Sequence, residues 1–397
     1  MRSGSRGKRI VSVALFAIAA LAWLACLNGE ESPARSSPEE EGFRLVMADA
    51  PQGAPLAGWR APGSDMAFVV GGQILRSGGG FVWSLDMREE RASTLVGAPG
   101  ALWWIHGTSE TEMWVVGERG FAGFFSGRSL RELAMPDTFA LEDVTLYGVW
   151  TQDGDEVWAV GVERRADASE RGVLLRSTDR DSFQEVDYGF VAESPLYKVW
   201  GSGPNDVFVV GDRGIILRWD GASWARLESG TDQRLGVVHG RGPNQVWAAG
   251  GSSEGILLRW DGATWRRDES LPSGTAPLYG LWVAPEDGYF PDPSAPGAQL
   301  PAVLYVSGTY GTVGRRYENG PWVVQDAPET PDVLHSVLGW STDRALALGG
   351  NLASGPPYTG VVLALSAGFD DFILLDGSPY YRNGVRPPSG GGGGGFQ

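Results

Sequence analysis

Two stretches in the middle of this 397-residue chain are copies of one another. Leu196–Trp224 reads LYKVWGSGPNDVFVVGDRGIILRWDGASW, and Leu235–Trp265 reads LGVVHGRGPNQVWAAGGSSEGILLRWDGATW. Each copy holds short apolar, β-type runs that are separated by Gly, Pro, Asn and Asp. Self-similarity of this period indicates a repeat architecture, in which each copy builds one structural unit.

The phrase Leu-x-x-aliphatic-(Trp/His/Leu) marks the repeat along the chain. It begins at Leu102, Leu146, Leu196, Leu235, Leu278 and Leu334, with spacings of 44, 50, 39, 43 and 56 residues. Four-stranded propeller blades take roughly 40–50 residues, and the 3.6-residue apolar period of a helical repeat is absent. A weaker seventh copy precedes these, because Ala67–Gly71 (AFVVG) matches Val207–Gly211 (VFVVG). We therefore predict an all-β, seven-bladed β-propeller over residues 43–376, with six or eight blades as alternatives.

Within a blade, the turn residues separate four strands. For the first copy we expect, in order, strands at Leu196–Trp200, Val207–Gly211, Gly214–Arg218 and Trp224–Leu227. The chain ends are expected to close the ring. Phe43–Ala48 has the pattern of an outer strand, and we expect it to pair in the last blade around Asp371–Leu375, since this pairing removes an exposed edge.

The N-terminus carries an export signal. Four basic residues precede the apolar run Ile10–Leu24, and Ala25-Cys26 follows directly after it. The run is shorter than a typical membrane-spanning helix. Leu21–Cys26 (LAWLAC) resembles a bacterial lipobox, with Trp23 and Leu24 as departures from its usual pattern. The resemblance implies a signal peptide over residues 1–25 and a lipid on Cys26, the single cysteine. The alternative is a conventional secretory signal cut after Ala22.

The segments that flank the predicted propeller have no core-forming pattern. Residues 26–42 are polar and acidic, which predicts a disordered tether behind the lipid anchor, and residues 377–397 are a Gly- and Pro-rich flexible tail. Acyl chains hold a protein to a membrane without spanning it. By resemblance to lipoprotein sorting rules, Leu27 favours the outer membrane of the cell envelope, with the periplasmic or surface side left open.

The net charge and the few histidines and cysteines argue against nucleic-acid binding and against a metal site. The formal net charge is −16, and it becomes −20 once the four basic residues of the signal are removed. A field of this sign repels nucleic acid, so we expect no nucleic-acid partner. The chain has three histidines and one cysteine, without the clustering that zinc requires, and most Asp residues fall in expected turns. We therefore predict neither a metal nor a cofactor.

The histidines fall at repeat positions. His106 and His239 align with Trp150, Trp200, Trp282 and Leu338, and His335 aligns with Tyr147, Tyr197 and Tyr279. A position that alternates between His and a large apolar residue fills space between blades. We therefore expect all three histidines to be packing residues and predict no catalytic residue.

Departures from the repeat are the better candidates for ligand contact, because shared residues build the scaffold. Val162–Arg171 and Gly349–Gly360 lengthen loops between second and third strands, on the face that usually carries a propeller's ligand. The candidate contacts are Glu163, Arg164, Arg165 and Tyr358 from these loops, and Lys198 on a strand that lines the channel. We expect the adjacent arginines to grip a carboxylate, and Lys198 either to hold an anion or to pair with a carboxylate. Ala284–Pro301 is inserted on the opposite face. It is either a docking loop or a surface loop without a binding role.

The repeats resemble a known group of proteins. Trp200–Trp224 (WGSGPNDVFVVGDRGIILRWDGASW) and its partner from His239 to Trp265 look like propeller repeats of secreted and surface proteins in myxobacteria and related bacteria. They are more distantly similar to photosystem II assembly-factor and BNR (sialidase-type) propellers. The resemblance covers residues 50–376 and implies a fold without implying an activity, since such folds host unrelated functions.

These observations predict a lipid-anchored, non-catalytic propeller that binds an envelope protein or a glycan. Two alternatives stay open. One is a glycan-processing enzyme, a hydrolase or lyase with a site at the channel mouth, which needs convergent acid and base groups in one pocket. The other is an assembly or motility factor within an envelope complex. The oligomeric state is not predicted.

Overall fold

The computed structural model describes residues 42–50, 52–61, 63–74, 79–88, 91–189, 194–284, 303–317, 320–326, 333–339, 344–352, 356–365 and 373–374. The chain divides into Met1–Glu41 and Gly42–Gln397, and all described residues belong to the second unit. The predicted signal peptide, Cys26 and the tether up to residue 41 therefore lie outside the described residues, as does the predicted tail. No helix in the described ranges is both long and apolar enough to cross a membrane.

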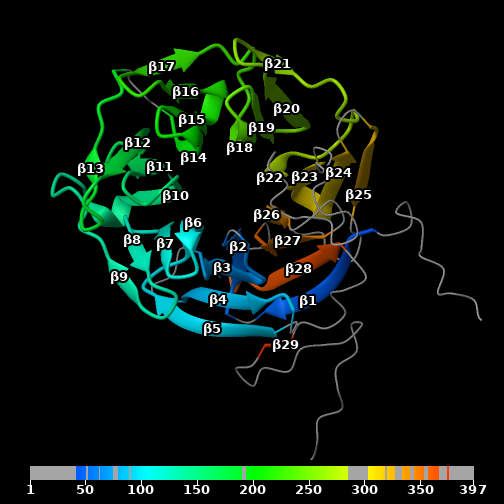
Figure 1. The fold of residues 1–397 in the computed structure, drawn as a ribbon, viewed down its shortest axis with the longest axis horizontal. Helices are drawn as coiled ribbons and strands as arrows, with labels where there is room; N and C mark the ends of the chain where they lie inside the picture. The colour runs from blue at the N-terminus through cyan, green and yellow to red at the C-terminus, as the bar shows by residue number, and fades with distance from the viewer. Residues whose placement is uncertain are drawn as a thin grey trace, which may run out of the picture. The chain divides into compact units, whose positions relative to one another are not determined.

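Short apolar runs between turn residues form seven sheets around a central axis (Figure 1). The prediction of a seven-bladed propeller is confirmed. We number the blades 1 to 7 in the chain order of their first strands. The first strand of each blade lies next to the axis, and later strands lie progressively outward.

The first four blades are regular. Blade 1 contains β2 (Ala54–Arg60), β3 (Met66–Gly72), β4 (Gly80–Asp86) and β5 (Arg91–Ala98). Blade 2 contains β6 (Leu102–Ser109), β7 (Glu112–Gly117), β8 (Ala122–Phe125) and β9 (Leu130–Glu132). Blade 3 contains β10 (Val144–Thr151), β11 (Val157–Arg164), β12 (Glu170–Ser177) and β13 (Gln184–Glu185). Blade 4 contains β14 (Leu196–Gly203), β15 (Asp206–Gly211), β16 (Ile216–Trp219) and β17 (Trp224–Leu227).

The last three blades repeat this plan. Blade 5 contains β18 (Leu235–Gly242), β19 (Gln245–Gly251), β20 (Gly255–Trp260) and β21 (Trp265–Arg267). Blade 6 contains β22 (Leu278–Val283), β23 (Val303–Gly308), β24 (Thr312–Tyr317) and β25 (Trp322–Asp326). Blade 7 contains β26 (Val333–Gly339), β27 (Ala345–Gly350), β28 (Gly360–Leu365) and β1 (Arg44–Ala50) from the other end of the chain.

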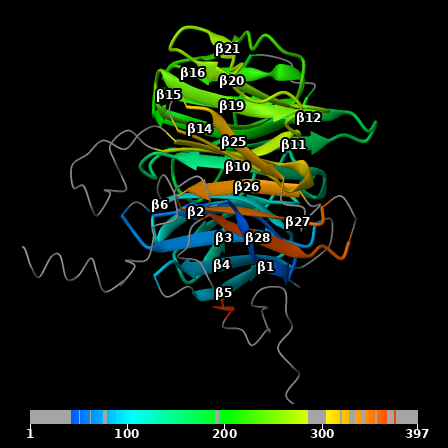
Figure 2. The same cartoon turned by 90° about the vertical axis from the view of Figure 1, so that its right-hand side faces the viewer.

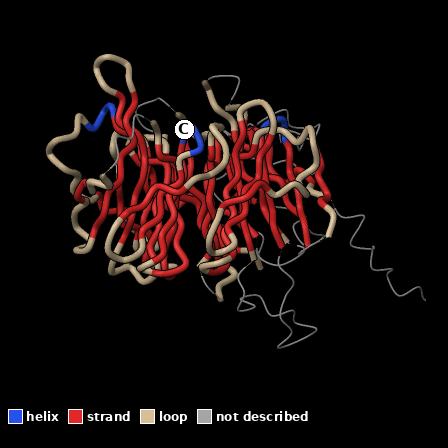
Figure 3. The backbone as a smooth tube through the Cα atoms, turned by 90° about the horizontal axis from the view of Figure 1, so that it is seen from above, coloured by secondary structure: helices blue, strands red, loops and turns tan. Residues whose placement is uncertain are grey.

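The ring has two distinct faces, seen edge-on in Figures 2 and 3. The loop face carries the connections between the second and third strands. It also carries three short 3-10 turns, η1 (Leu141–Asp143), η2 (Asp212–Gly214) and η3 (Thr309–Gly311). The opposite face, here called the first-turn face, carries the turns between first and second strands. Each inner strand therefore runs from the loop face to the first-turn face.

The N-terminal strand closes the ring. β1 pairs antiparallel with β28, with Arg44 opposite Ala364 and Leu45 opposite Leu363. The prediction of an N-terminal outer strand in the last blade is confirmed, but the expected partner around Asp371–Leu375 is wrong. Because β1 already occupies the outer edge of β28, β29 (Ile373–Leu374) pairs elsewhere, as a parallel fifth strand beside β5 of blade 1.

The six repeat leucines occupy the inner strands as expected. Each lies within the first three residues of its strand and is fully buried, from Leu102 in blade 2 to Leu334 in blade 7. The apolar residues of the second strands form clusters that extend from one blade into the next. Burial on both faces explains why these strands read as continuous apolar runs.

Neighbouring blades meet at one repeated position near the first-turn face. Its seven residues, here called the belt, are Trp59, His106, Trp150, Trp200, His239, Trp282 and Leu338. The ring of Trp150 lies over Gly201 of the next blade, where an added Cβ would be 2.5 Å from the ring. Two further pairs share this contact. An added Cβ would be 2.7 Å from the Trp200 ring on Gly240, and 2.4 Å from the Trp282 ring on Gly339. A glycine leaves the space that the indole of the preceding blade fills.

The two belt histidines meet larger partners. His106 Nδ1 accepts a hydrogen bond from the backbone N–H of Thr151 at 3.4 Å, and His239 Nδ1 accepts one from Val283 at 3.3 Å. An imidazole is smaller than an indole, so the next blade accommodates a β-branched residue in place of glycine. The expectation that His106 and His239 pack between blades is confirmed.

The first prediction concerns this junction. Gly201→Ala should lower the free energy of unfolding by about 1–3 kcal/mol, because the new methyl group overlaps the Trp150 ring. Equilibrium urea unfolding followed by tryptophan fluorescence measures the change.

Gly203→Ala is the matched control. It lies on the same strand, and the nearest atom to an added Cβ is Gln152 Oε1 at 3.6 Å, so stability should be almost unchanged. Equal effects of the two substitutions would contradict the proposed role of the Trp–Gly contact.

Candidate functional site

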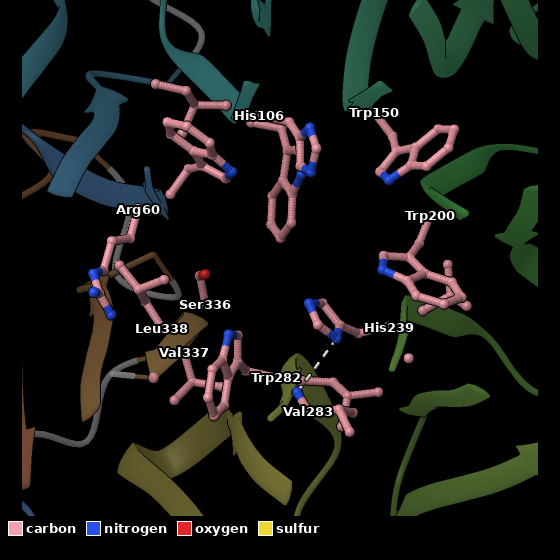
Figure 4. A pocket seen from close by; sticks show the side chains of 18 of the residues that line it. Arg60, His106, Trp150, Trp200, His239, Trp282, Val283, Ser336, Val337 and Leu338 are labelled. Atoms are coloured by element: carbon pink, nitrogen blue, oxygen red, sulfur yellow. Dashed lines mark hydrogen bonds between the residues drawn. The ribbon is translucent and has the colours of Figure 1, made fainter. Parts of the chain in front are cut away.

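The belt encloses a cavity at the first-turn end of the central channel. Its volume is about 300 Å³, and six belt rings and Leu338 line it (Figure 4). The residues that directly precede five of the belt residues in the sequence add an apolar layer to the wall. They are Ile105, Val199, Val238, Leu281 and Val337. Ligand cavities in proteins are usually of this kind, concave and largely apolar, with a few placed polar groups.

The imidazoles in the cavity wall are neutral. Burial, and secondly the nearby His239, lowers the pKa of His106 to about 3, and burial lowers the pKa of His239 to about 4. Because each Nδ1 accepts a backbone N–H, the ring hydrogen is assigned to Nε2. Neither ring therefore offers a free basic nitrogen near neutral pH, which is unfavourable for general acid or base catalysis.

Aromatic rings also contact one another around the loop end of the channel. The ring centroid of Trp103 is 5.2 Å from that of Tyr147 and 5.3 Å from that of His335, and the centroid of Tyr147 is 5.7 Å from that of Tyr197. His335 is buried, and its Nδ1 lies 2.7 Å from the carbonyl oxygen of Leu56. The expectation that His335 is a packing residue is confirmed.

Blade 5 has Gly236 at the position where five of the other blades have a ring and blade 1 has Leu56, and the Arg234 side chain fills the space that a ring would take. Its guanidinium lies 4.0 Å from the ring centroid of Tyr279 and 5.8 Å from that of Tyr197. An added Cβ on Gly236 would be 2.6 Å from Arg234 Nη1, so the guanidinium occupies the vacant ring position. Cation–π contacts on both sides hold it there.

Lys198 lies between these two layers and is 3 % exposed. Its Nζ donates to the carbonyl oxygen of Tyr147 at 2.6 Å and lies 4.1 Å from the ring centroid of Trp104. Burial first, and the like charge of Arg234 second, lowers the pKa of Lys198 to about 7. Among the described residues, its contacts include no carboxylate. The structure thus favours the expected anion site over the expected carboxylate pair, and ligand binding by Lys198 stays a prediction.

The predicted arginine loop is a long hairpin with few free charges. β11 and β12 continue to Arg164 and Glu170, so the actual loop is shorter than the expected Val162–Arg171. Glu163 accepts from Arg171 at 2.8 Å, and Arg164 lies 3.6 Å from Glu170 across the hairpin. Arg165 is exposed in the loop. Because Glu163 and Arg164 pair within the hairpin, the two arginines do not form an isolated positive site, and their contact with a ligand stays a prediction.

Tyr358 is mostly buried beneath the loop face. It is 7 % exposed and packs in a cluster with Leu56, Ile74 and Ala101. Its backbone is held by Gln73, whose Nε2 donates to the Tyr358 carbonyl at 2.7 Å. The side chain is therefore part of the core, and contact of Tyr358 with a ligand stays a prediction.

The predicted docking loop and the predicted lipid site lie largely outside the described residues. Ala284 is described, but residues 285–302 of the predicted docking loop lie outside the described residues, as does Cys26. Within the described ranges, no group of three or more His, Cys, Asp or Glu side chains has a metal-binding arrangement.

The sequence alignment of the repeats identifies six of the seven belt residues but not the cavity that they line. The Trp/His alternation predicts packing alone, and Trp59 lies in the degenerate first blade, outside that alignment. The available signal was that six of the seven belt residues are ring residues on strands next to the axis. Rings at that position face both the next blade and the channel.

Comparison with known proteins identifies the fold alone. No protein-family model matches the sequence, and no curated protein matches it. The structure titled "Structure of U3-55K" has a TM-score of 0.58 and 11% identity, over 82% of this chain and 98% of that chain. The WD40 propeller domain of Doa1 has a TM-score of 0.55 and 12% identity, over 82% and 97%. "YCF48 bound to D1 peptide" covers 66% of this chain and 92% of that chain at 16% identity, with a TM-score of 0.39. The chain has a WD40-like β-propeller fold.

The second prediction concerns pH. The folded-state pKa values of His106, His239 and His335 lie at about 3 to 4, below the ordinary 6.5 of the unfolded chain. As pH falls below 6.5, the unfolded state takes up protons that the folded state does not, so stability is lost. The loss should approach about 1.4 kcal/mol per pH unit for each histidine.

Urea unfolding between about pH 6.5 and 5 isolates this effect, because most carboxylates are still ionised there. His239→Asn should reduce the slope, since its Oδ1 lies where Nδ1 lies, can accept the Val283 N–H and does not titrate. An unchanged slope would show that the His239 pKa is not lowered in the folded protein.

Proposed function

We propose that this protein is a non-catalytic binding module of the cell envelope, held to the membrane by a lipid on Cys26, and that its ligand seat is the belt cavity. The observation that carries the proposal is the cavity itself, which is enclosed by aromatic rings and neutral imidazoles at one end of a closed propeller. WD40-type propellers with the same fold support a role in molecular recognition.

The chemistry of the wall supports binding over catalysis. No carboxylate is among the described residues that line the cavity, and both histidines have pKa values far below neutrality. A glycan hydrolase or lyase needs an acid and a base that converge on one bond. No feature of the described cavity favours that alternative.

The wall also bears on the choice between a glycan and another partner. A sugar hydroxyl donates as well as accepts, and a desolvated donor without a partner is costly. Ser336 Oγ is the single side-chain oxygen among the described residues that line the cavity. We therefore favour a ligand other than a neutral glycan in this seat.

The third prediction tests the anchor. Cys26→Ser should abolish labelling by an alkyne fatty acid and move the protein to the soluble fraction, because acyl chains are the proposed hold on the membrane. In-gel fluorescence and fractionation measure both effects. Retention of the variant in the membrane would contradict the proposed anchor.

The fourth prediction tests the seat. Arg60 lines the cavity, so replacing it with the photo-cross-linking residue p-benzoylphenylalanine should give a discrete adduct when cells are irradiated. Intact-mass spectrometry and gel mobility detect small and large ligands respectively. The control is the same replacement at Arg226, an exposed residue of β17, which should give none of these adducts. Identical adducts at both positions, or none at Arg60, would contradict a ligand seat in the channel.

A further inference from the structure

The belt presents hydrogen-bond donors to the cavity. In Figure 4 the indole nitrogens of Trp150 and Trp200 face the hollow, while their six-membered rings lie toward the blades. An indole nitrogen is a donor only. Two belt tryptophans from neighbouring blades 3 and 4 thus direct N–H groups toward one space.

A belt imidazole adds a donor of the same kind. The Nδ1 of His239 is occupied by the Val283 N–H, which is the dashed line in Figure 4, and its other nitrogen faces the hollow. With Nδ1 as the acceptor, Nε2 carries the hydrogen. His106 makes the equivalent bond to Thr151, so its Nε2 is also a donor.

Acceptors are scarce in the same wall. Of all side chains described as lining the cavity, Ser336 alone has an oxygen atom. A ligand that fills the cavity must therefore bring its own acceptors, or the N–H groups lose their hydrogen bonds to water. The remaining surface, formed by indole faces and aliphatic side chains, suits an apolar body.

A buried positive charge lies next to the cavity wall. Lys198 lies against Trp104, a lining residue, with its Nζ 4.1 Å from the ring centroid. Lys198 is buried and bonds to a backbone carbonyl, with no carboxylate among its described partners. This arrangement disfavours an ammonium ligand, although tryptophan cages of other proteins bind such cations, and it favours an anion.

We propose that the belt cavity binds the carboxylate of a small apolar molecule: indole and imidazole N–H groups donate to its oxygens, the rings enclose its body, and Lys198 contributes the balancing charge from behind Trp104. This inference rests on the proposed ligand seat and specifies its chemistry. Hydrogen bonds to an ionised acceptor are stronger than those to a neutral one, so charge should discriminate between ligands of one shape. A volume of about 300 Å³ accommodates one aromatic ring with a short carboxylate arm.

Three probes of similar shape test the charge. Isothermal titration calorimetry on the full chain in detergent should show phenylacetate binding with a dissociation constant of about 1 mM or tighter, as a ligand of this size allows. Phenylacetamide should bind at least about fivefold more weakly, and benzyltrimethylammonium should not bind. Equal binding of the acid and the amide, preference for the ammonium compound, or no saturable binding of phenylacetate would each overturn the proposal.

Matched variants test the residues. Trp200→Phe removes the N–H but keeps a ring, and should weaken phenylacetate binding about tenfold. Trp219→Phe, in the outer part of the same blade and outside the cavity lining, should leave it unchanged. Lys198→Met should weaken phenylacetate but not phenylacetamide. Equal effects of the two tryptophan variants, or equal effects of Lys198→Met on both probes, would overturn the assignment.

The experiments distinguish failure of the proposed ligand seat from failure of the proposed carboxylate chemistry. If the photo-cross-link at position 60 forms but phenylacetate does not bind, the cavity is a ligand seat and the carboxylate inference is wrong. If neither occurs, both are wrong.

Discussion

The contact between a belt residue and the next blade is the interaction on which this structure most depends. Trp150 over Gly201 and His106 against Thr151 are two solutions to one problem, which is how wedge-shaped sheets fit together near the axis. An indole requires a glycine opposite it in the next blade. The smaller imidazole leaves room for a β-branched residue and accepts a hydrogen bond from the backbone N–H of that residue. Because the ring of blades is closed, a misfit at one junction strains the others, so the complementary pairs at these five junctions help to maintain the geometry of the whole ring.

The same contact creates the cavity. A ring that spans a blade junction has its outer edge against the neighbour and its inner edge toward the channel, so packing residues also face the channel. At the loop end, aromatic rings and the Arg234 guanidinium contact one another around the axis. At the first-turn end, belt rings stay apart and leave about 300 Å³. The position of the candidate site therefore follows from how the blades are joined.

Buried charge gives the channel its electrostatic character. The whole chain is acidic, yet Lys198 lies next to the axis with a backbone carbonyl and an indole face as its partners. Keeping a cation there without an opposite charge costs free energy, which its lowered pKa reflects. The hairpin arginine Arg164, by contrast, pairs with Glu170 in solvent, where such pairs contribute little. The unusual charge of this protein is thus inside the ring and not on its loops.

The sequence by itself determined the repeat, the number of blades, the strands of each blade and the packing role of the histidines, because these depend on local turn chemistry and on periodic apolar runs. It also indicated an outer strand at Phe43–Ala48. Only the tertiary structure decided that this strand pairs with β28, that Tyr358 is buried, and that the belt rings line a cavity. Each of these depends on which residues distant in the chain meet around the axis, and the closure of the ring, which no local pattern encodes, decides those meetings.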